Sequence, residues 1–311
     1  MRKIDSVHWL LYTGIREDHG MEQTFEATME KPNYDLIYKL TSEYYTQQIL
    51  LVKALYEHQY DELEKTENPR ITSLYHLVLS IYLTGSAINL LAINNYLAES
   101  YMLARALLEK MINYMYLLVC EENDYKKYLN YTKQKSYRAL NRSYTAGNQK
   151  VELKWSGSIN LDDYPDLKEA IKQFTSTKGK AITRWNNKSL AEMINVIREK
   201  TGINVMGLMY SVLGIYDDAS EALHGTLYGA TFNYGFFGGE IPSNAKEFTE
   251  TYRNHTLTLF FALGTSISSL IEVILKVCPT DRVKELDTQS GQNFTDLGKY
   301  LDTVAPKRKT Q

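Results

Sequence analysis

Long runs of apolar residues at helical spacing, separated by short polar breaks, cover most of this 311-residue chain. Apolar positions that recur every three or four residues predict amphipathic helices. Only 6 prolines occur and glycine is thinly spread, so few positions interrupt these runs. The pattern predicts an all-α fold, in which a single helical-bundle domain of about seven or eight helices carries a long C-terminal helix.

The predicted helices follow one another with short connections. Some have clear end signals: Ser189, with Glu192 three residues later, forms a capping box, and Pro279 ends the last helix. Gly85 and Ser86 lie within an apolar helix, where small residues allow a neighbour to approach closely. The expected ranges are 34–64, 71–93, 98–119, 123–142, 165–174, 190–200, 204–229 (as one or two helices) and 244–277. Residues 145–162 are expected to form a loop.

The chain divides into three parts. Residues 1–32 form a mixed leading segment with a short helix expected at 6–16. Residues 33–279 form the single all-α domain. Residues 280–311 are polar, end in Pro-Lys-Arg-Lys-Thr-Gln, and are expected to be a mobile tail.

The overall charge changes the picture little, because the net charge is −2 and the pI is about 6.3. With no global basic excess, contact with nucleic acid needs a local patch. Residues 125–144 form the one clear basic-aromatic stretch, in which Tyr alternates with Lys and Arg. Two interpretations stay open: this stretch stacks bases and contacts phosphates of RNA, or it is a solvated amphipathic face.

The cysteines and the apolar runs predict a cytoplasmic protein that does not cross a membrane. Cys120 and Cys278 form no Cys-x-x-Cys pattern and are expected to be reduced thiols. The N-terminus lacks the apolar core of a signal peptide. Residues 256–277 are the best candidate for a membrane span, but they contain Glu272 and Lys276, which favours a buried helix.

Motifs for metals and cofactors are missing from the sequence. The histidines have no metal-ligand spacing, and there is no His-Glu-x-x-His and no Cys/His cluster. Neither Gly-x-x-x-x-Gly-Lys nor Gly-x-Gly-x-x-Gly occurs. We therefore expect no bound metal and no cofactor.

The predicted helix 98–119 carries the first candidate site. It is apolar nearly all round and should therefore be buried. Arg105 and Glu109 nevertheless lie four residues apart on one face, and Tyr101 and Asn113 extend the same stripe. A buried charged pair must be paired and hydrogen-bonded. The pair is either an internal ion pair that fixes helix register or a clamp for an anion such as phosphate.

A second candidate lies in the predicted helix 204–229. Ser220 and His224 are four residues apart and share a face with Asp217 and Tyr228. Gly225 follows directly and allows a backbone or a ligand to approach. His224 is either a satisfied core group or, because a histidine titrates near neutral pH, an acid–base catalyst.

Three stretches together resemble a known family: Leu-Ala-Arg-Ala-Leu-Leu-Glu at 103–109, Trp185 ahead of the Ser-capped helix, and Tyr216-x-x-x-Ser-Glu-x-x-His-Gly at 216–225. Over residues 70–230 the chain resembles the bacterial all-helical domain-of-unknown-function family 5677. It is also similar to HEPN helical domains, many of which are metal-independent ribonucleases in toxin–antitoxin and anti-phage systems.

The resemblance implies a HEPN-like core whose polar centre is Arg105, Glu109, Ser220 and His224. Tyr216 of the quoted motif, with Tyr101 and Asn113 of the charged stripe, completes the candidate site. Arg105, Glu109 and His224 would be catalytic, and the binding residues would be Ser220, Tyr216, Tyr101 and Asn113. In HEPN nucleases the arginine and histidine lie on one helix. Here Arg105 and His224 lie on two predicted helices, so they can meet only through the fold.

Two functions are weighed. In the first, the protein is a metal-independent ribonuclease of a toxin or anti-phage defence system: the ribose 2′-hydroxyl attacks the phosphate, His224 transfers the proton and Arg105 stabilises the charge. In the second, it is a non-catalytic helical module that binds a partner protein encoded nearby or a small anionic ligand. A homodimer is also expected, through helix 256–277 packed across a two-fold axis.

Overall fold

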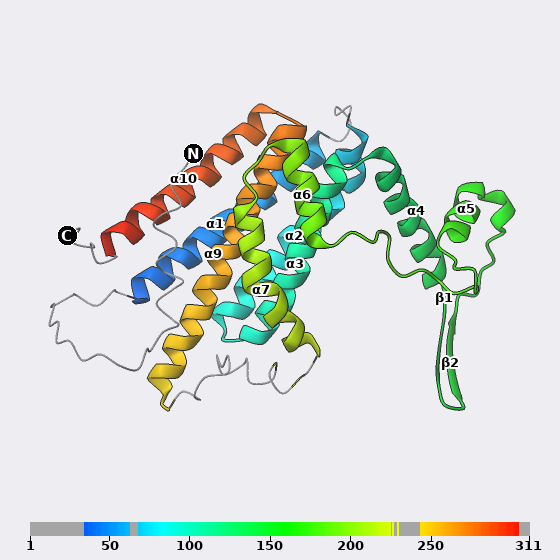
Figure 1. Ribbon diagram of the computed structural model, residues 1–311, viewed down its shortest axis with the longest axis horizontal. Helices are drawn as coiled ribbons and strands as arrows, with labels where there is room; N and C mark the ends of the chain where they lie inside the picture. The colour runs from blue at the N-terminus through cyan, green and yellow to red at the C-terminus, as the bar shows by residue number, and fades with distance from the viewer. Residues whose placement is uncertain (1–33, 63–67, 225, 227–228, 230–242, 305–311) are drawn as a thin grey trace.

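A computed structural model describes residues 34–62, 68–224, 226, 229 and 243–304. In this part of the chain the structure has nine α-helices, which confirms the predicted all-α class (Figure 1). They are α1 (Tyr34–Asp61), α2 (Pro69–Ile93), α3 (Leu97–Val119), α4 (Glu122–Ala139), α5 (Pro165–Gln173), α6 (Leu190–Thr201), α7 (Met206–His224), α9 (Ala245–Val277) and α10 (Asp281–Val304).

Helix ends fall where the local sequence places them. The capping box at the start of α6 is complete, because Ser189 and Glu192 each accept from the other's backbone N–H. That helix ends at Gly202, whose φ of 72° is easy only for glycine. Asn68 caps α2, and its side chain accepts from the backbone N–H of Arg70.

Helix α3 lies in the middle of the bundle and packs against α2, α6, α7 and α9, while α1 packs against α2, α9 and α10 (Figure 1). As its sequence predicts, α3 buries most of its surface: Leu107, Leu108, Met111 and Ile112 are wholly inaccessible. Between α1 and α9, the ring of Tyr45 stacks on Phe260 with the centroids 4.6 Å apart. The main apolar cluster of the core takes residues from every described helix except α5, and a small second cluster lies between α1 and α10.

Helices α1 and α2 approach each other at Gly85, as expected from the small residues there. The hydroxyl of Tyr45 donates to the carbonyl oxygen of Gly85 at 3.1 Å. A Cβ atom at this position would overlap the buried side chain of Ile49. The glycine is needed for its size.

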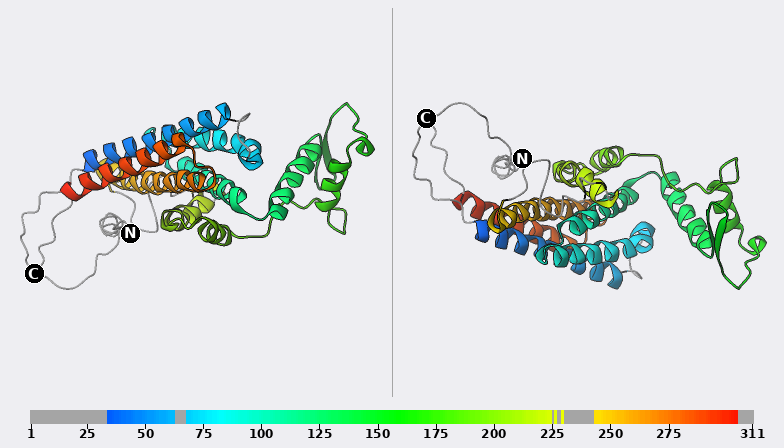
Figure 2. Two further views of the ribbon diagram at one scale, coloured as in Figure 1. Left: turned by 90° about the horizontal axis from the view of Figure 1, so that it is seen from above. Right: turned by 90° about the horizontal axis from the view of Figure 1, so that it is seen from below.

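An arm projects from the bundle between α3 and α6 (Figures 1 and 2). It consists of α4, the strands β1 (Asn141–Ala146) and β2 (Gln149–Lys154), the short 3-10 turn η1 (Leu161–Asp163) and α5. The strands pair antiparallel, joined through Gly147, whose φ is 57°. The expected loop at 145–162 is therefore wrong over the hairpin, because Gln-Lys-Val-Glu-Leu-Lys at 149–154 alternates with the period of a strand.

The tail was expected to be mobile, but over Asp281–Val304 it forms the helix α10, which packs against α1 and α9. Its sequence is polar on average, but its few apolar residues recur at helical spacing and are buried: Val283, Leu286, Leu297 and Leu301. Ser290 donates to Gln48 of α1 at 3.0 Å and is 2.8 Å from Ser268 of α9. The leading segment 1–32, with its expected helix at 6–16, lies outside the described residues.

Two helices of the described part, α2 and α9, are long and apolar enough to cross a membrane. In α9 the most apolar window is 67% buried inside the protein. Leu259, Phe260, Leu263 and Ile267 all face the core. Helix α9 therefore has little apolar surface left for the two-fold contact that its sequence suggested.

Replacing Gly85 by leucine should lower the free energy of unfolding by about 1–3 kcal/mol, because the added side chain overpacks the α1–α2 contact. A matched control is Gly214→Ala in α7, where a Cβ atom meets nothing within 4 Å. That change should stabilise the protein by about 0.5–1 kcal/mol through helix propensity. Urea unfolding followed by circular dichroism measures both. Equal effects at the two glycines would contradict the packing argument.

Candidate functional site

The structure brings four of the predicted site residues together where α3 meets α7. Arg105 and Glu109 come from α3, and Tyr216 and Ser220 come from α7. Each pair is four residues apart, so each lies on one helix face directed at the other. The sequence predicted the Arg105–Glu109 pair from its spacing and named Tyr216 and Ser220 as binding residues, and the fold brings all four together.

The hydrogen bonds of the cluster centre on the Arg105 guanidinium. Its Nε donates to Glu109 Oε1 at 3.2 Å, one terminal nitrogen donates to Ser220 Oγ at 2.5 Å, and the other donates to the Tyr216 hydroxyl at 3.0 Å. The Tyr216 hydroxyl in turn donates to Glu109 Oε1 at 3.0 Å. Ser220 donates to the Tyr216 carbonyl oxygen at 2.6 Å. Every guanidinium nitrogen thus has an acceptor within the protein.

The cluster lies at the edge of the helix contact and not in the core. The Arg105 side chain is 21% exposed and that of Glu109 is 41% exposed, so the expected burial of the pair is only partial. The Arg105 guanidinium also lies over the Tyr216 ring, 4.2 Å from its centroid. Burial, then the hydrogen bond to Glu109 and its negative charge, raise the pKa of the Tyr216 hydroxyl. Tyr216 therefore stays neutral and donates to Glu109.

His224 lies apart from this network. It is the last residue of α7 and is exposed. Its Cα is one helical turn, about 6 Å along the axis, beyond that of Ser220. Among the residues that the structure describes, no hydrogen bond or ion pair joins His224 to the cluster. His224 thus shares a face of α7 with Ser220, and in the described part of the chain no hydrogen bond or ion pair joins it to Arg105.

The two remaining predicted binding residues donate hydrogen bonds to backbone carbonyl oxygens of the protein. Tyr101 is buried, and its hydroxyl donates to the carbonyl oxygen of His255 in α9 at 3.3 Å. The side-chain amide of Asn113 donates to the Glu109 carbonyl oxygen at 2.7 Å. Tyr101 therefore belongs to the core, because its position on α3 turns the ring toward α9.

The charges around the cluster are mostly negative. Asp217, Asp218 and Glu221 neighbour Ser220 on α7, and Asp217 is exposed. Lys110, next to Glu109 on α3, donates to Thr84 of α2 at 2.6 Å. Within the described ranges, the surroundings of Arg105 thus lack the basic lining that a phosphate-binding site needs.

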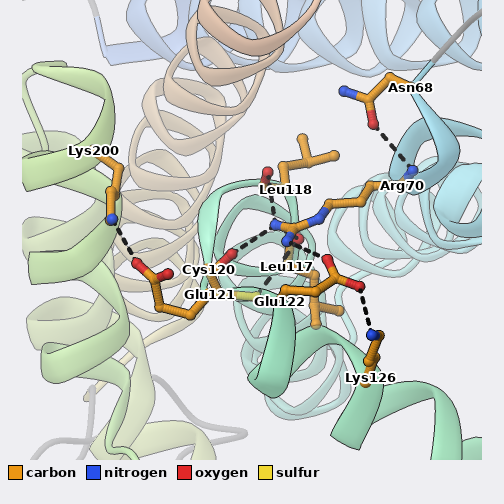
Figure 3. A network of polar contacts seen from close by, with 9 residues as sticks. All are labelled: Asn68, Arg70, Leu117, Leu118, Cys120, Glu121, Glu122, Lys126 and Lys200. Carbon is orange, nitrogen blue, oxygen red and sulfur yellow. Dashed lines mark hydrogen bonds and ion pairs between the residues drawn. The ribbon is translucent and has the colours of Figure 1, made fainter.

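A second polar network, not found from the sequence, fixes the base of the arm (Figure 3). Arg70 of α2 donates to the carbonyl oxygens of Leu117, Leu118 and Cys120, at 3.2, 3.3 and 2.7 Å. These belong to the last turn of α3, where carbonyl groups have no helical partner and carry partial negative charge. Arg70 also pairs with Glu122 at 3.1 Å, so it joins the end of α3 to the start of α4.

The return of the chain from the arm is fixed by a second contact. Lys188, just before α6, pairs with Asp124 of α4 at 2.8 Å, and Asp124 also accepts from the Tyr116 hydroxyl at 2.5 Å. The Trp185 ring packs against those of Tyr116 and Tyr128, at centroid distances of 6.0 and 5.3 Å. Of this set the sequence pointed only to Trp185, because its partners are at least 57 residues away in the chain.

The arm has a positive net charge, whereas the rest of the chain is negative. Residues 122–188 contain fourteen Lys and Arg against seven Asp and Glu, a net charge of +7. Since the whole chain has −2, the remainder carries −9. The basic-aromatic stretch 125–144 covers α4 and part of β1, and it was the one signal of this asymmetry.

Over the described residues, no group of three or more His, Cys, Asp and Glu side chains could hold a metal ion. Cys120 and Cys278 are free thiols. Burial raises the pKa of the Cys120 thiol to about 11, so this thiol is unreactive at neutral pH.

The fold and the site define an all-α bundle with an Arg–Glu–Tyr–Ser cluster between two core helices and a projecting basic arm. The chain belongs to a family of unknown function, DUF5677, whose profile matches residues 73–240. That span runs from α2 to beyond α7 and so includes the cluster, His224 and the whole arm. No curated protein and no solved structure matches the chain.

The arm contact predicts an acid-dependent stability. Hydrogen bonds from Lys188 and Tyr116 lower the pKa of Asp124. Because the unfolded chain then binds this proton more readily, the stability from Asp124 is present above pH about 4 and is lost as the pH falls through the lowered pKa. We expect Asp124→Asn to destabilise the protein at neutral pH and to reduce the slope of stability against pH in that acid window.

Chemical unfolding between neutral pH and the acid window measures this effect. Lys188→Met is the matched control, because it removes the partner and keeps the carboxylate. In the Lys188→Met background, Asp124→Asn should cost less than it does in the natural protein. Additive effects of the two substitutions would show that the pair does not contribute.

Proposed function

We propose that this protein is a non-catalytic helical module that binds a partner protein, and that the Arg105 cluster holds α3 and α7 in register. One observation carries the proposal: all three guanidinium nitrogens of Arg105 donate to acceptors of the protein, and Glu109 balances its charge. An arginine that clamps phosphate needs its donors directed at the ligand. Here the donors serve the α3–α7 contact.

The exposed apolar residues support a binding role. Isolated exposed side chains are common, but groups of them on one element mark interaction surfaces. Two such groups stand out, one on the hairpin of the arm and one on α7: Tyr144, Val151 and Leu153, and Met206, Met209 and Leu213. Both lie within the residues that the family profile matches.

A specific observation also favours the second candidate, a metal-independent ribonuclease of the HEPN kind acting in a toxin or anti-phage system. His224 is exposed one turn from Ser220, and the Arg105 side chain is not fully buried. For cleavage, the 2′-hydroxyl would attack the adjacent phosphorus and the 5′-oxygen would leave, with His224 transferring the proton. Arg105 would have to exchange Ser220 or Tyr216 for the phosphate, beside three acidic residues of α7.

The module proposal predicts that Arg105→Ala lowers the free energy of unfolding by about 1–3 kcal/mol, because Glu109, Tyr216 and Ser220 lose their shared donor. Partial exposure of the pair keeps the effect below that of a fully buried ion pair. Lys39→Ala is the control, since Lys39 forms an exposed i,i+4 pair with Glu43, and should cost less than about 0.5 kcal/mol. An Arg105→Ala protein as stable as the control variant would count against the structural role.

The two candidates differ in their response to His224→Ala. The module proposal expects that the purified protein does not cleave RNA in the presence of a chelator, and that the substitution changes nothing. RNA cleavage that is lost in His224→Ala at an unchanged melting temperature would establish the ribonuclease and overturn the module. Leu223→Ala, an exposed neighbour, serves as the control for indirect effects.

A further inference from the structure

The hairpin of the arm has one apolar and one polar face. In an antiparallel pair, residues opposite each other point to the same side. Arg142 lies opposite Leu153 and Tyr144 lies opposite Val151, so these four share a face with Ala146 and Gln149. The other face carries Asn141, Ser143, Thr145, Lys150, Glu152 and Lys154.

The polar face is complete within the chain, because Glu152 pairs with both Lys150 and Lys154. The apolar face is uncovered: Tyr144 is 75% exposed, and Val151 and Leu153 are each 66% exposed. The hairpin lies at the far end of the arm, apart from the bundle (Figure 1), and the arm projects from the bundle in all three views (Figures 1 and 2). A two-stranded hairpin is only marginally stable in water unless its apolar face packs on something.

The bundle offers a matching surface on α7. Met206, Met209 and Leu213 recur at i, i+3 and i+7 and form one stripe, with exposed fractions of 56%, 52% and 81%. Asp217 follows four residues after Leu213 on the same side and is exposed. Among the described residues Asp217 forms no ion pair. On α7 the apolar stripe is therefore followed by a negative charge. The exposed face of the hairpin likewise combines apolar residues with one charge, the positive charge of Arg142 near the base of the hairpin.

We propose that the surface covering the hairpin is α7 of a second copy of this chain. The apolar face of one subunit's hairpin packs on Met206, Met209 and Leu213 of the other, and Arg142 pairs with Asp217. A two-fold axis makes the contact twice. The inference rests on the proposed function, for which it names the partner.

Charge complementarity and symmetry favour a second copy. The arm carries +7 and the rest of the chain −9, so the arm of one subunit is attracted to the bundle of the other. A stable interface buries about 1,200–2,000 Å² in total. Because the contact occurs twice, each hairpin needs to supply only half of that area. RNA fits the hairpin less well, because its two lysines already pair with Glu152 and the uncovered face is apolar.

A charge exchange tests the proposed contact. Sedimentation of the full chain at increasing concentration should show a dimer. Arg142→Glu alone and Asp217→Arg alone should each weaken the dimer by roughly a hundredfold, because like charges then face each other. An equimolar mixture of the two variants should dimerise again, because in the heterodimer both contacts join opposite charges.

A second pair of variants tests the face of the hairpin. Val151→Glu should give a monomer, whereas Thr145→Glu, on the polar face of the same hairpin, should leave the dimer intact. Circular dichroism should be unchanged in both, which separates lost assembly from lost folding. A chain that is monomeric at every concentration, a dimer indifferent to Val151→Glu, or a mixture that fails to restore the dimer would each overturn the proposal.

The failures of the two proposals are distinguishable. If the chain is a monomer and substitutions in the arm abolish its binding to a different protein, the module proposal stands. The second copy is then ruled out as the partner. A monomer whose arm binds single-stranded RNA, with binding lost in Val151→Glu, assigns the surface to nucleic acid and also overturns the dimer. Metal-independent RNA cleavage that depends on His224 overturns the module itself.

Discussion

The burial of α3 on almost every side is the constraint on which the rest of the structure depends. A helix that is apolar nearly all round is stable only when other helices surround it, and burying one leucine or isoleucine contributes about 1.5–3 kcal/mol. Helices α2, α6, α7 and α9 provide this cover. Because these neighbours fill the space around α3, the chain that leaves its C-terminal end turns away from the bundle. The arm is a consequence of this packing.

Polar contacts fix α3 at two places along its length. At its C-terminal end, Arg70 binds the free carbonyl groups and positions α4. Toward its middle, Arg105 joins Glu109 to Tyr216 and Ser220 and fixes how α7 lies on α3. Each contact satisfies groups that would otherwise be left without partners at a packed surface, where a lost hydrogen bond costs more than its formation contributes. Both arginines therefore stabilise the helix contacts through the placement of their hydrogen-bond donors as well as through their charge.

The arm is positive and the rest of the chain is negative, although the net charge of the whole chain is only −2. A basic arm with an uncovered apolar hairpin and an acidic bundle with an uncovered stripe on α7 are complementary surfaces on one chain. The hairpin and α7 lie apart within a single molecule (Figure 1). Association with a second copy, as proposed, would cover both surfaces.

The sequence by itself determined most of the helices and their ends, because helical periodicity and caps such as Ser189 act within a few residues of the chain. It also singled out Arg105 with Glu109 and Ser220 with His224, since a four-residue spacing places side chains on one face, and the family motif added Tyr216. It missed the hairpin, where the strand period is short, and α10, where a polar average hid a narrow apolar stripe. Only the tertiary structure decided that Ser220 and Tyr216 meet the Arg105 pair, that Tyr101 turns into the core, that His224 stays outside the cluster, and that Arg70 reaches the end of α3. Those contacts join residues 47 to 154 positions apart, and their formation depends on how whole helices pack, which local spacing does not encode.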